Sequence, residues 1–135
     1  GNLGTIIRLA EWFGVETVFM SPDCVEVWNP KVIQSSMGSI FRVRTVTSDI
    51  PDICRRFKSA GMQVYGTFLD GTDMYSQQLT KEGLVVMGNE SNGVSAEVAA
   101  EVSSKLFIPS YGNSRAESLN VAVATAVTLA EFRRR

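Results

Sequence analysis

The sequence predicts an α/β fold with a mainly parallel sheet flanked by helices. Short apolar stretches typical of strands, such as 84–87, alternate along the chain with stretches of helical periodicity, such as 49–60. This alternation is typical of proteins in which helices cover a parallel sheet. The 135 residues are enough for one domain with a substantial core, so we expect a single domain over residues 1–135.

Capping residues mark the helix boundaries in the first half of the chain. Thr5 can cap a helix that Gly14 ends, and Gly61 ends another. Asn29 followed by Pro30 is typical of a cap and a first helical position. In order, we expect a helix over 5–13, a strand over 16–20, a helix over 30–36, a strand over 41–46 and a helix over 49–60.

The second half of the chain continues the same alternation. The stretch 84–87 is apolar throughout, as expected of a strand that is covered on both faces, and Ser95 can cap the helix that follows. In order, we expect a strand over 62–69, a turn over 70–73, a strand over 84–87, a helix over 95–103, a strand over 105–108 and a helix over 118–134. The last helix carries one apolar stripe, made of Leu119, Val123, Ala126, Val127 and Ala130 and widened by Ala122 and Leu129.

Composition excludes several classes of function. Because the chain has no histidine, serine–histidine hydrolysis and histidine-ligated metals are excluded, and no metal is expected. A net charge of −1 gives no global attraction to nucleic acid or to a membrane. No apolar run approaches the ~20 residues of a membrane span, and no signal peptide is recognisable. Cys24 and Cys54 are expected to be buried free thiols of a cytoplasmic protein, since both stand in apolar surroundings.

The start of the chain is unusual. A glycine-containing turn, 1–4, leads at once into a helix without a preceding strand. Such a turn normally follows a strand. We therefore expect the sequence to be N-terminally truncated and to lack its first strand.

Three loops are candidates for a ligand site, because ligands of open parallel sheets bind beyond the carboxyl ends of the strands. They cover 69–73, 88–93 and 109–118. The loop 88–93 is the most polar, and its two glycines allow backbone to approach a ligand. Glu90 within it is also suited to capping the next helix, and both interpretations stay open here. A dinucleotide site is a weaker alternative, because no G-x-G-x-x-G follows a strand.

Three blocks of the sequence resemble a known family. Asn-Leu-Gly-Thr-Ile-Ile-Arg at 2–8, Gly-Asn-Glu-Ser-Asn-Gly-Val-Ser at 88–95 and the segment 108–121, with Ile-Pro at its start and Ser-Leu-Asn-Val at its end, stand in order along the chain. They resemble motifs 1, 2 and 3 of the SpoU family of RNA 2′-O-ribose methyltransferases, which belongs to the SPOUT superfamily. The blocks span almost the whole chain.

The resemblance implies an enzyme that transfers a methyl group from S-adenosyl-L-methionine to a ribose 2′-hydroxyl of tRNA or rRNA. It implies no metal. The residues that correspond to the family's polar catalytic positions are Asn2, Arg8, Glu90, Ser118 and Asn120. The residues expected to bind the cofactor, mostly through backbone groups, are Thr67, Leu69, Gly88, Asn89, Ile108 and Leu119.

Arg8 is the residue that the family's mechanism associates with the ribose proton. Its reference pKa above ~12 argues against a literal base. A guanidinium that holds an RNA phosphate and stabilises the developing alkoxide is chemically simpler. Glu90 would orient Arg8 or hold the loops, while Ser118 and Asn120 would position the ribose. The alternative for Arg8 is a solvated helix arginine.

The resemblance also implies a deep trefoil knot at the C-terminal end and a homodimer. The apolar stripe of the last helix fits a dimer interface, although a helix that covers its own sheet explains the stripe equally well. Family members often carry a further RNA-binding domain upstream, and we expect any such domain to be missing from this N-terminally truncated sequence. We therefore expect the fragment to bind S-adenosyl-L-methionine but to methylate RNA poorly.

RNA binding has weaker support from the residues themselves. Basic residues cluster at 55–58, at 42–44 and at 133–135, and such clusters are more often solvated faces than RNA sites. The loop 112–118 is longer than the family's common form, which makes it a candidate determinant of substrate preference. Two alternatives remain: a catalytically inactive RNA-binding relative of the same fold, and an unrelated nucleotide-binding α/β module.

Overall fold

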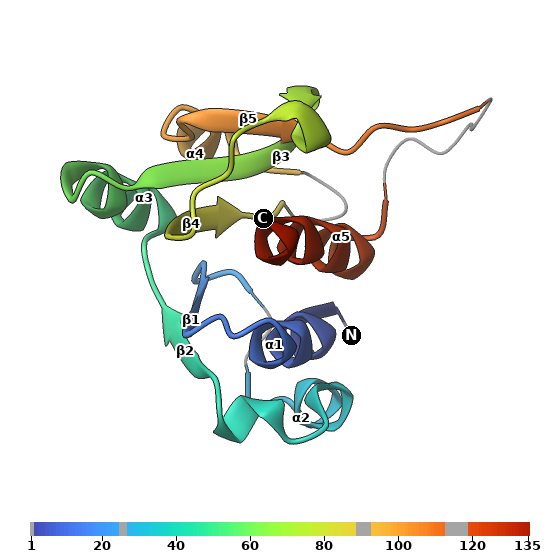
Figure 1. The fold of residues 1–135 in the computed structure, drawn as a ribbon. Helices are drawn as coiled ribbons and strands as arrows, with labels where there is room; N and C mark the ends of the chain where they lie inside the picture. The colour runs from blue at the N-terminus through green and yellow to red at the C-terminus, as the bar shows by residue number, and fades with distance from the viewer. Residues whose placement is uncertain (1, 25–26, 89–92, 113–118) are drawn as a thin grey trace. The chain divides into compact units, whose positions relative to one another are not determined.

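The structure is a computed structural model that describes residues 2–24, 27–88, 93–112 and 119–135. The chain divides into two compact units, Gly1–Ile50 and Pro51–Arg135, and each is described by itself. Figure 1 shows the elements of both units along the chain. The strand pairs of both units are parallel, which confirms the predicted mainly parallel α/β fold.

The first unit pairs two short parallel strands with two helices. Its elements are α1 (Asn2–Trp12), β1 (Thr17–Met20), α2 (Pro30–Ser36), the 3-10 helix η1 (Ser39–Phe41) and β2 (Arg44–Thr47). β1 and β2 run in register from Thr17 opposite Arg44 to Met20 opposite Thr47. The buried core consists of apolar side chains from α1, α2, η1 and the residue before β2: Ile7, Ala10, Val32, Ile40 and Val43.

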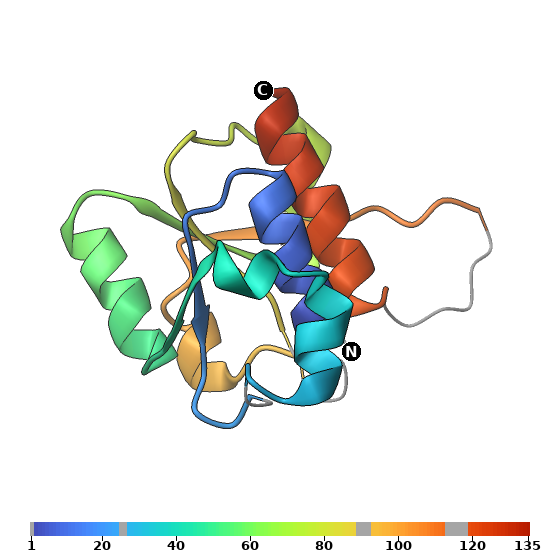
Figure 2. The ribbon, with the colours of Figure 1, turned by 90° about the horizontal axis from the view of Figure 1, so that it is seen from below.

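The contact between α1 and α2 depends on Gly4. The two helices lie side by side in Figure 2. A Cβ atom built on Gly4 would stand 1.8 Å from Ser35 Oγ and 2.6 Å from the carbonyl oxygen of Val32, both on α2. Only a residue without a side chain allows this approach, which is the physical reason for the glycine in the first sequence block.

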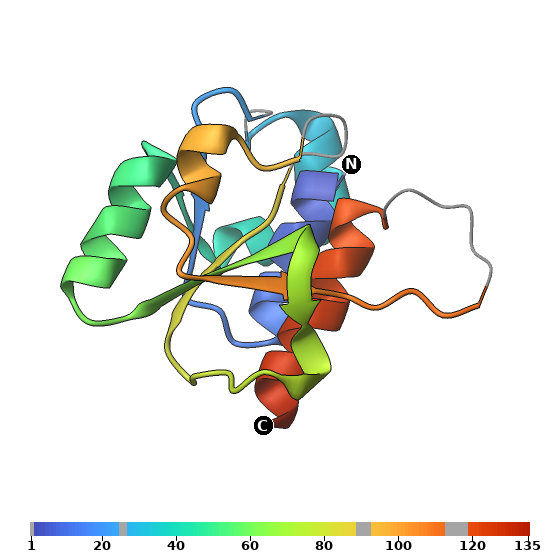
Figure 3. The ribbon, with the colours of Figure 1, turned by 90° about the horizontal axis from the view of Figure 1, so that it is seen from above.

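The second unit is a three-stranded parallel sheet with helices packed around it. It contains α3 (Ile50–Ser59), β3 (Gln63–Asp73), the 3-10 helix η2 (Met74–Ser76), β4 (Gly83–Val86), α4 (Ala96–Ala99), β5 (Ser104–Phe107) and α5 (Val121–Arg134). The strand order is β4-β3-β5, and both neighbours run parallel to β3, as Figure 3 shows for β5. The core cluster of Tyr65, Met74 and Leu106 receives Val127 and Phe132 from α5.

An ionic clamp joins the end of α5 to the chain that follows β3. Glu131 is only 5% exposed and accepts hydrogen bonds from Arg134 and Arg135. Arg135 in turn donates to the carbonyl oxygens of Met74 at 3.1 Å and Tyr75 at 3.0 Å. The hydrogen bond from Arg134, with a further contribution from Arg135, lowers the pKa of Glu131 to about 2, although burial opposes the shift. The clamp therefore fixes η2 against the C-terminal helix.

Most expected elements are present, with shifted ends. The helix over 30–36 is confirmed: Asn29 caps it by accepting the amide proton of Lys31 at 3.0 Å. Gly14 and Gly61 adopt positive φ directly after their helices, as predicted. The first helix starts at Asn2, before the expected cap Thr5, and the strand expected from residue 41 starts only at Arg44, after a 3-10 turn. The helix expected over 95–103 is shorter, Ala96–Ala99.

The turn expected over 70–73 is wrong. β3 continues to Asp73, because Thr72 and Asp73 pair with Leu106 and Phe107 of β5. A long-range strand pairing overrides the local turn preference of the Asp-Gly dipeptide. The last helix was expected from Ser118 but is helical from Val121, with Asn120 as its cap; Ser118 lies outside the described residues.

Replacing Gly4 by alanine should destabilise the protein by ~1–3 kcal/mol, because the added methyl group overpacks the α1–α2 contact. Alanine is otherwise favoured over glycine in a helix by about 1 kcal/mol, so any net loss reports the close contact. Urea unfolding of Gly4→Ala measures the difference. An unchanged or raised unfolding midpoint would contradict the tight packing of α1 on α2.

Replacing Glu131 by glutamine should lower the thermal unfolding midpoint by a few degrees at neutral pH, since both arginines lose their carboxylate partner. The folded-state pKa of Glu131 lies near 2, below its ordinary value of 4.5, so its contribution is complete above pH 4.5 and is lost as the pH falls toward 2. The two proteins should therefore converge in acid. Glu97→Gln, at an exposed glutamate of α4, is the matched control and should change little.

Candidate functional site

The carboxyl ends of the three parallel strands of the second unit form the candidate site. Thr67, Gly88 and Ile108 each lie at or just beyond the pairing region of β3, β4 and β5. The hydroxyl of Thr67 contacts the sulfur of Met87 at 4.0 Å, which links the end of β3 to the residue before Gly88. The fold thus gathers residues that are distant in the sequence at one sheet edge, as predicted.

Gly88 lies against the chain that returns after the second loop. A Cβ atom built on Gly88 would stand 2.7 Å from the carbonyl carbon of Gly93 and 2.8 Å from the amide nitrogen of Val94. Any side chain there would push the two ends of the loop apart. Asn89 and Glu90, predicted to bind cofactor and to act in catalysis, lie outside the described residues.

β3 makes an arch before it ends. Thr67 and Thr72 both pair with Leu106, so the residues between them leave the sheet and return. Gly71 permits the return, because a Cβ atom there would stand 2.6 Å from the carbonyl carbon and oxygen of Leu106. Lys105 supports the arch from β5: its ammonium lies 4.8 Å from the ring centre of Phe68 and 3.6 Å from a carboxylate oxygen of Asp70.

Two leucines among the residues predicted to bind the cofactor are exposed to an unusual degree. Leu69, at the top of the arch, is 75% exposed, and Leu119, just before α5, is 49% exposed. Ile108 is partly buried against the Tyr65–Met74–Leu106 cluster. Exposed leucines beside closely packed backbone suit a ligand with a flat apolar ring and polar edges, because such a ligand needs apolar contact together with backbone hydrogen bonds. An adenosine group has this character, so these residues fit the cofactor that the sequence predicts.

Asn120 has a structural task in addition to its predicted role. Its Oδ1 atom accepts the amide protons of Ala122 at 2.8 Å and Val123 at 3.2 Å, which caps α5. The side chain itself is exposed. The carbonyl half of the amide therefore fixes the start of the helix. Ser118, its predicted partner in catalysis, lies outside the described residues.

Asn2 and Arg8 belong to the first unit. Both lie on α1, six positions apart, which places them about 120° apart around the helix axis. Arg8 is exposed between the buried Ile7 and Ala10, and it makes no ion pair with the residues that the structure describes. It is therefore a solvent-facing cation on an otherwise anchored helix.

The basic cluster on α3 is neutralised within the protein. Arg55 and Lys58 lie 3.5 Å and 3.4 Å from carboxylate oxygens of Glu101, and Arg56 lies 3.1 Å from Asp52. At the chain end, Arg134 and Arg135 pair with Glu131. These clusters therefore behave as the paired surface faces that such runs usually form.

A pocket of about 450 Å³ lies in the first unit and was not predicted from the sequence. It opens beyond the carboxyl ends of β1 and β2, and none of its lining residues is a predicted site residue. The only signal in the sequence is a proline-containing loop after a short strand, which is common in proteins of every kind. The lining consists of Met20, Ser21, Pro22, Cys24, Val27, Trp28 and Thr47.

The two cysteines differ in environment. Cys54 is a buried free thiol, as predicted, and burial raises its pKa. The prediction for Cys24 is wrong: the thiol is exposed, because it lies in the loop after β1, 3.4 Å from the hydroxyl of Ser21.

Among the described residues, none of the helices combines the length and apolar character required to cross a bilayer. The same residues contain no cluster of three or more metal-ligating side chains.

Comparisons with known proteins agree with the motifs. The sequence model of the SpoU rRNA methylase family matches residues 1–130. Over 134 residues the chain is 36% identical to the 23S rRNA (guanosine(2553)-2′-O)-methyltransferase RlmP of Bacillus subtilis, covering 98% of this chain and 53% of that protein. The chain thus spans about half the length of this relative.

Solved structures with the same fold are also similar in sequence. An RNA methyltransferase of the TrmH family from Porphyromonas gingivalis, described as putative, superposes with a TM-score of 0.93 at 44% identity, over 99% of this chain and 55% of that one. An AdoMet-bound rRNA methyltransferase from Sinorhizobium meliloti gives a TM-score of 0.89 at 35% identity, over 98% and 51% of the two chains.

Replacing Asn120 by alanine should cost ~1 kcal/mol of stability, because two amide protons at the start of α5 lose their acceptor. Asn120→Ser should retain most of that stability, since a serine hydroxyl caps helices about as well. Chemical denaturation of both variants measures the difference. Equal stability of the alanine variant and the parent would show that the cap contributes nothing.

Proposed function

This chain belongs to the SpoU rRNA methylase family, and from that membership we propose that it is the catalytic part of an RNA methyltransferase. The reaction moves a methyl group from S-adenosyl-L-methionine to a ribose 2′-hydroxyl of rRNA or tRNA. Support comes from relatives named as 23S rRNA 2′-O-methyltransferases. The observation that carries the proposal is the sheet edge where Thr67, Gly88 and Ile108 meet.

The cofactor site is proposed at this edge. Backbone groups near Thr67, Gly88 and Ile108 would hold the polar edges of S-adenosyl-L-methionine, while Leu69 and Leu119 would contact its apolar surface. Asn89 is proposed to contribute from the second loop. The bound cofactor supplies an electrophilic methyl group on a sulfonium sulfur. The glycines at 71 and 88 let backbone close around such a ligand without a clash.

The chemistry that the chain itself must supply is alignment and charge stabilisation. Two substrates held in attack geometry gain ~7–11 kcal/mol over a free encounter. We propose that Arg8 stabilises the negative charge that develops on the ribose oxygen. Its guanidinium is exposed and makes no ion pair with a described residue. The hydroxyl proton leaves to solvent or to a neighbouring polar group, since an arginine remains protonated.

Asn2, Glu90, Ser118 and Asn120 complete the proposed catalytic set. Glu90 would orient Arg8 or hold the second loop, and Ser118 and Asn120 would position the ribose. The Oδ1 atom of Asn120 is engaged as the cap of α5. A rigid helix start is therefore proposed as the frame on which Asn120 and Ser118 meet the substrate.

We further propose that the protein works as a homodimer. The apolar stripe predicted on the last helix is only partly buried: Val123 is 50% exposed, Leu119 is 49% exposed and Ala130 is exposed, whereas Val127 packs against the core cluster of its own unit. The buried residues of α5 are Ala122, Ala124, Thr125, Thr128 and Glu131, of which Ala122 belongs to the predicted stripe. The exposed part of the stripe is available to a second copy of the chain. Action on bacterial-type rRNA would place the protein in the cytoplasm.

S-Adenosyl-L-homocysteine and S-adenosyl-L-methionine should both bind the chain in calorimetry, and NAD and ATP should not. The reason is that the proposed site would hold a sulfur-containing nucleoside through backbone contacts, and the sequence has no G-x-G-x-x-G phosphate loop after a strand. Failure of both sulfur ligands to bind, or equal binding of NAD, would favour an unrelated nucleotide-binding module.

Arg8→Ala should lower methyl transfer by ~100-fold in the intact protein and leave S-adenosyl-L-methionine affinity almost unchanged. Arg8→Lys should recover only part of the rate, because an ammonium keeps the charge but not the forked geometry. Arg56→Ala, which removes an exposed arginine paired with Asp52, is the matched control. Unchanged transfer in Arg8→Ala, or no transfer by the parent, would favour an inactive RNA-binding relative.

A further inference from the structure

Two large aromatic side chains of the first unit are exposed side by side. Trp28 is 56% exposed and Phe41 is 68% exposed, and their ring centres lie 5.9 Å apart with planes tilted by 47°. A soluble protein rarely leaves adjacent aromatic rings in water, since burying each would add about 1.5–3 kcal/mol of stability. Their exposure therefore needs an explanation outside the core of this unit.

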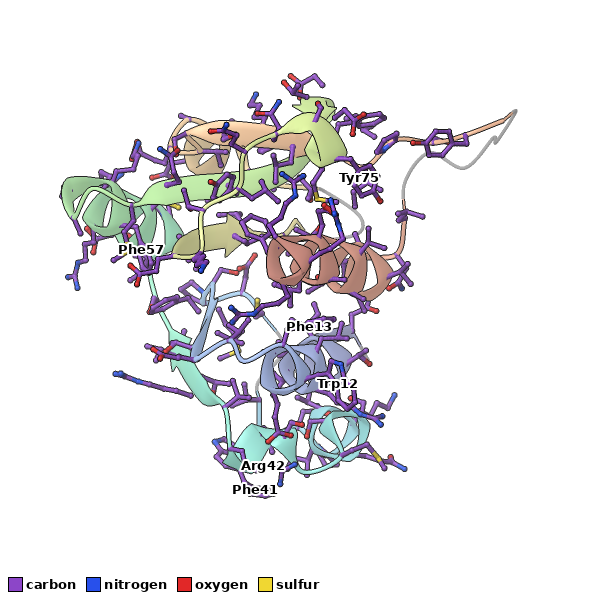
Figure 4. All side chains as sticks on the ribbon, viewed as in Figure 1. Trp12, Phe13, Phe41, Arg42, Phe57 and Tyr75 are labelled. Atoms are coloured by element: carbon purple, nitrogen blue, oxygen red, sulfur yellow. The ribbon has the colours of Figure 1, made fainter. Side chains whose placement is uncertain are left out.

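Both rings are held on fixed backbone. Phe41 ends η1, and residues on both sides of it bond to the same carboxylate: Ser39 Oγ donates to Glu11 at 2.8 Å, and Arg42 donates to Glu11 through its guanidinium at 2.9 Å. These bonds lower the pKa of Glu11. Trp28 directly precedes the cap Asn29 of α2. Figure 4 shows Phe41 and Arg42 at the η1 end of the unit.

The Trp28 ring is also a wall of the 450 Å³ pocket. Ser21 and Thr47 bring hydroxyl groups to the same pocket, and the Thr47 hydroxyl makes no hydrogen bond to any residue described in the structure. The volume falls within the range of sites that hold small flat ligands. An aromatic wall with a few polar groups suits one flat heterocycle with hydrogen-bonding edges.

Cations flank the aromatic pair. Lys31 stands three residues after Trp28, on the exposed side of α2, and makes no ion pair with a described residue. Arg42 follows Phe41 directly, and its side chain is 57% exposed while it pairs with Glu11. Among the described residues of the pocket loop, Asp23 is acidic, and its carboxylate accepts a hydrogen bond from Ser21. The surface thus combines aromatic faces with positive charge, which is the chemistry that binds single-stranded nucleic acid.

We propose that Trp28 and Phe41 form a stacking platform for unpaired bases of the RNA substrate, and that one base enters the pocket beside Trp28. The inference rests on the proposed function only in taking RNA as the substrate. Stacking is tolerant of base identity, while the hydroxyls of Ser21 and Thr47 reach the edge of the inserted base. Lys31 contributes attraction to the phosphates.

The chain offers a direct test, because Trp12 and Trp28 are its two tryptophans. Trp12→Phe leaves Trp28 as the fluorescent reporter, and Trp28→Phe leaves Trp12, which is 81% exposed on α1. Each protein is titrated with a single-stranded RNA of mixed sequence, about 12 nucleotides long, which suits the site sizes of such surfaces. Emission of Trp28 should be quenched saturably, and that of Trp12 should not. A blunt duplex of the same sequence should quench neither.

Aliphatic variants separate stacking from apolar contact. Trp28→Leu and Phe41→Leu should each weaken RNA binding about 5- to 150-fold, whereas Trp28→Phe and Phe41→Tyr should stay close to the parent. Circular dichroism checks that each variant is folded. Unquenched Trp28 in RNA titrations, equal quenching by duplex, or unchanged affinity of both leucine variants would overturn the platform. If RNA quenches Trp28 but S-adenosyl-L-homocysteine does not bind, the stacking platform is supported and the proposed methyl transfer is overturned.

Discussion

The second unit depends on the pairing of one strand with parallel neighbours on both sides. β3 hydrogen-bonds to β4 along one edge and to β5 along the other. Because all three strands run the same way, the segments that leave them emerge at one edge of the sheet. Two glycines make this crowding possible: Gly71 lies against the backbone of β5, and Gly88 lies against the returning loop. The candidate cofactor site is thus a consequence of backbone packing more than of particular side chains.

The ionic clamp at the end of α5 also stabilises the chain that follows β3. Arg135 holds the carbonyl oxygens of Met74 and Tyr75, which follow β3 without a gap. Glu131, 5% exposed, keeps Arg135 in place. A buried carboxylate is costly unless it is paired, and here two guanidinium groups supply the pairing. The C-terminal helix and the strand that leads into the site are therefore fixed by one group of charges.

The sequence predicted helix boundaries well where a capping residue or a glycine determines the boundary locally. Asn29 before Pro30 placed α2 correctly, and Gly14 and Gly61 placed two helix ends. Predictions failed where distant contacts decide. The Asp-Gly dipeptide at 70–71 resembles a turn, but it lies in the arch of β3, and the strand pairs with β5 again at Thr72 and Asp73.

For the site, too, the sequence predicted what depends on local signals and missed what depends on distant contacts. The second and third motifs start at Gly88 and Ile108, just beyond β4 and β5, and so identified two of the segments at the sheet edge, whereas the first motif lies on α1 of the first unit. Cys24 was misjudged, since apolar neighbours in sequence do not report whether a loop is covered. The pocket beside Trp28 was missed because it forms only when β1, β2 and the loop after β1 come together. Knotting of the chain, implied by the resemblance, stays a prediction.

The two units differ in how many of their described cations are paired with carboxylates. In the described part of the second unit, Arg55, Lys58 and Arg135 pair with carboxylates of the protein itself, whereas Lys81 is exposed and makes no ion pair with a described residue. The first unit exposes Arg8 and Lys31 without an ion pair to a described residue, together with the aromatic pair. Because a net charge of −1 gives no global attraction to RNA, the proposed RNA contact depends on a few uncommitted cations and exposed rings. Under the two proposals, the first unit would contact RNA and the sheet edge of the second unit would hold the cofactor.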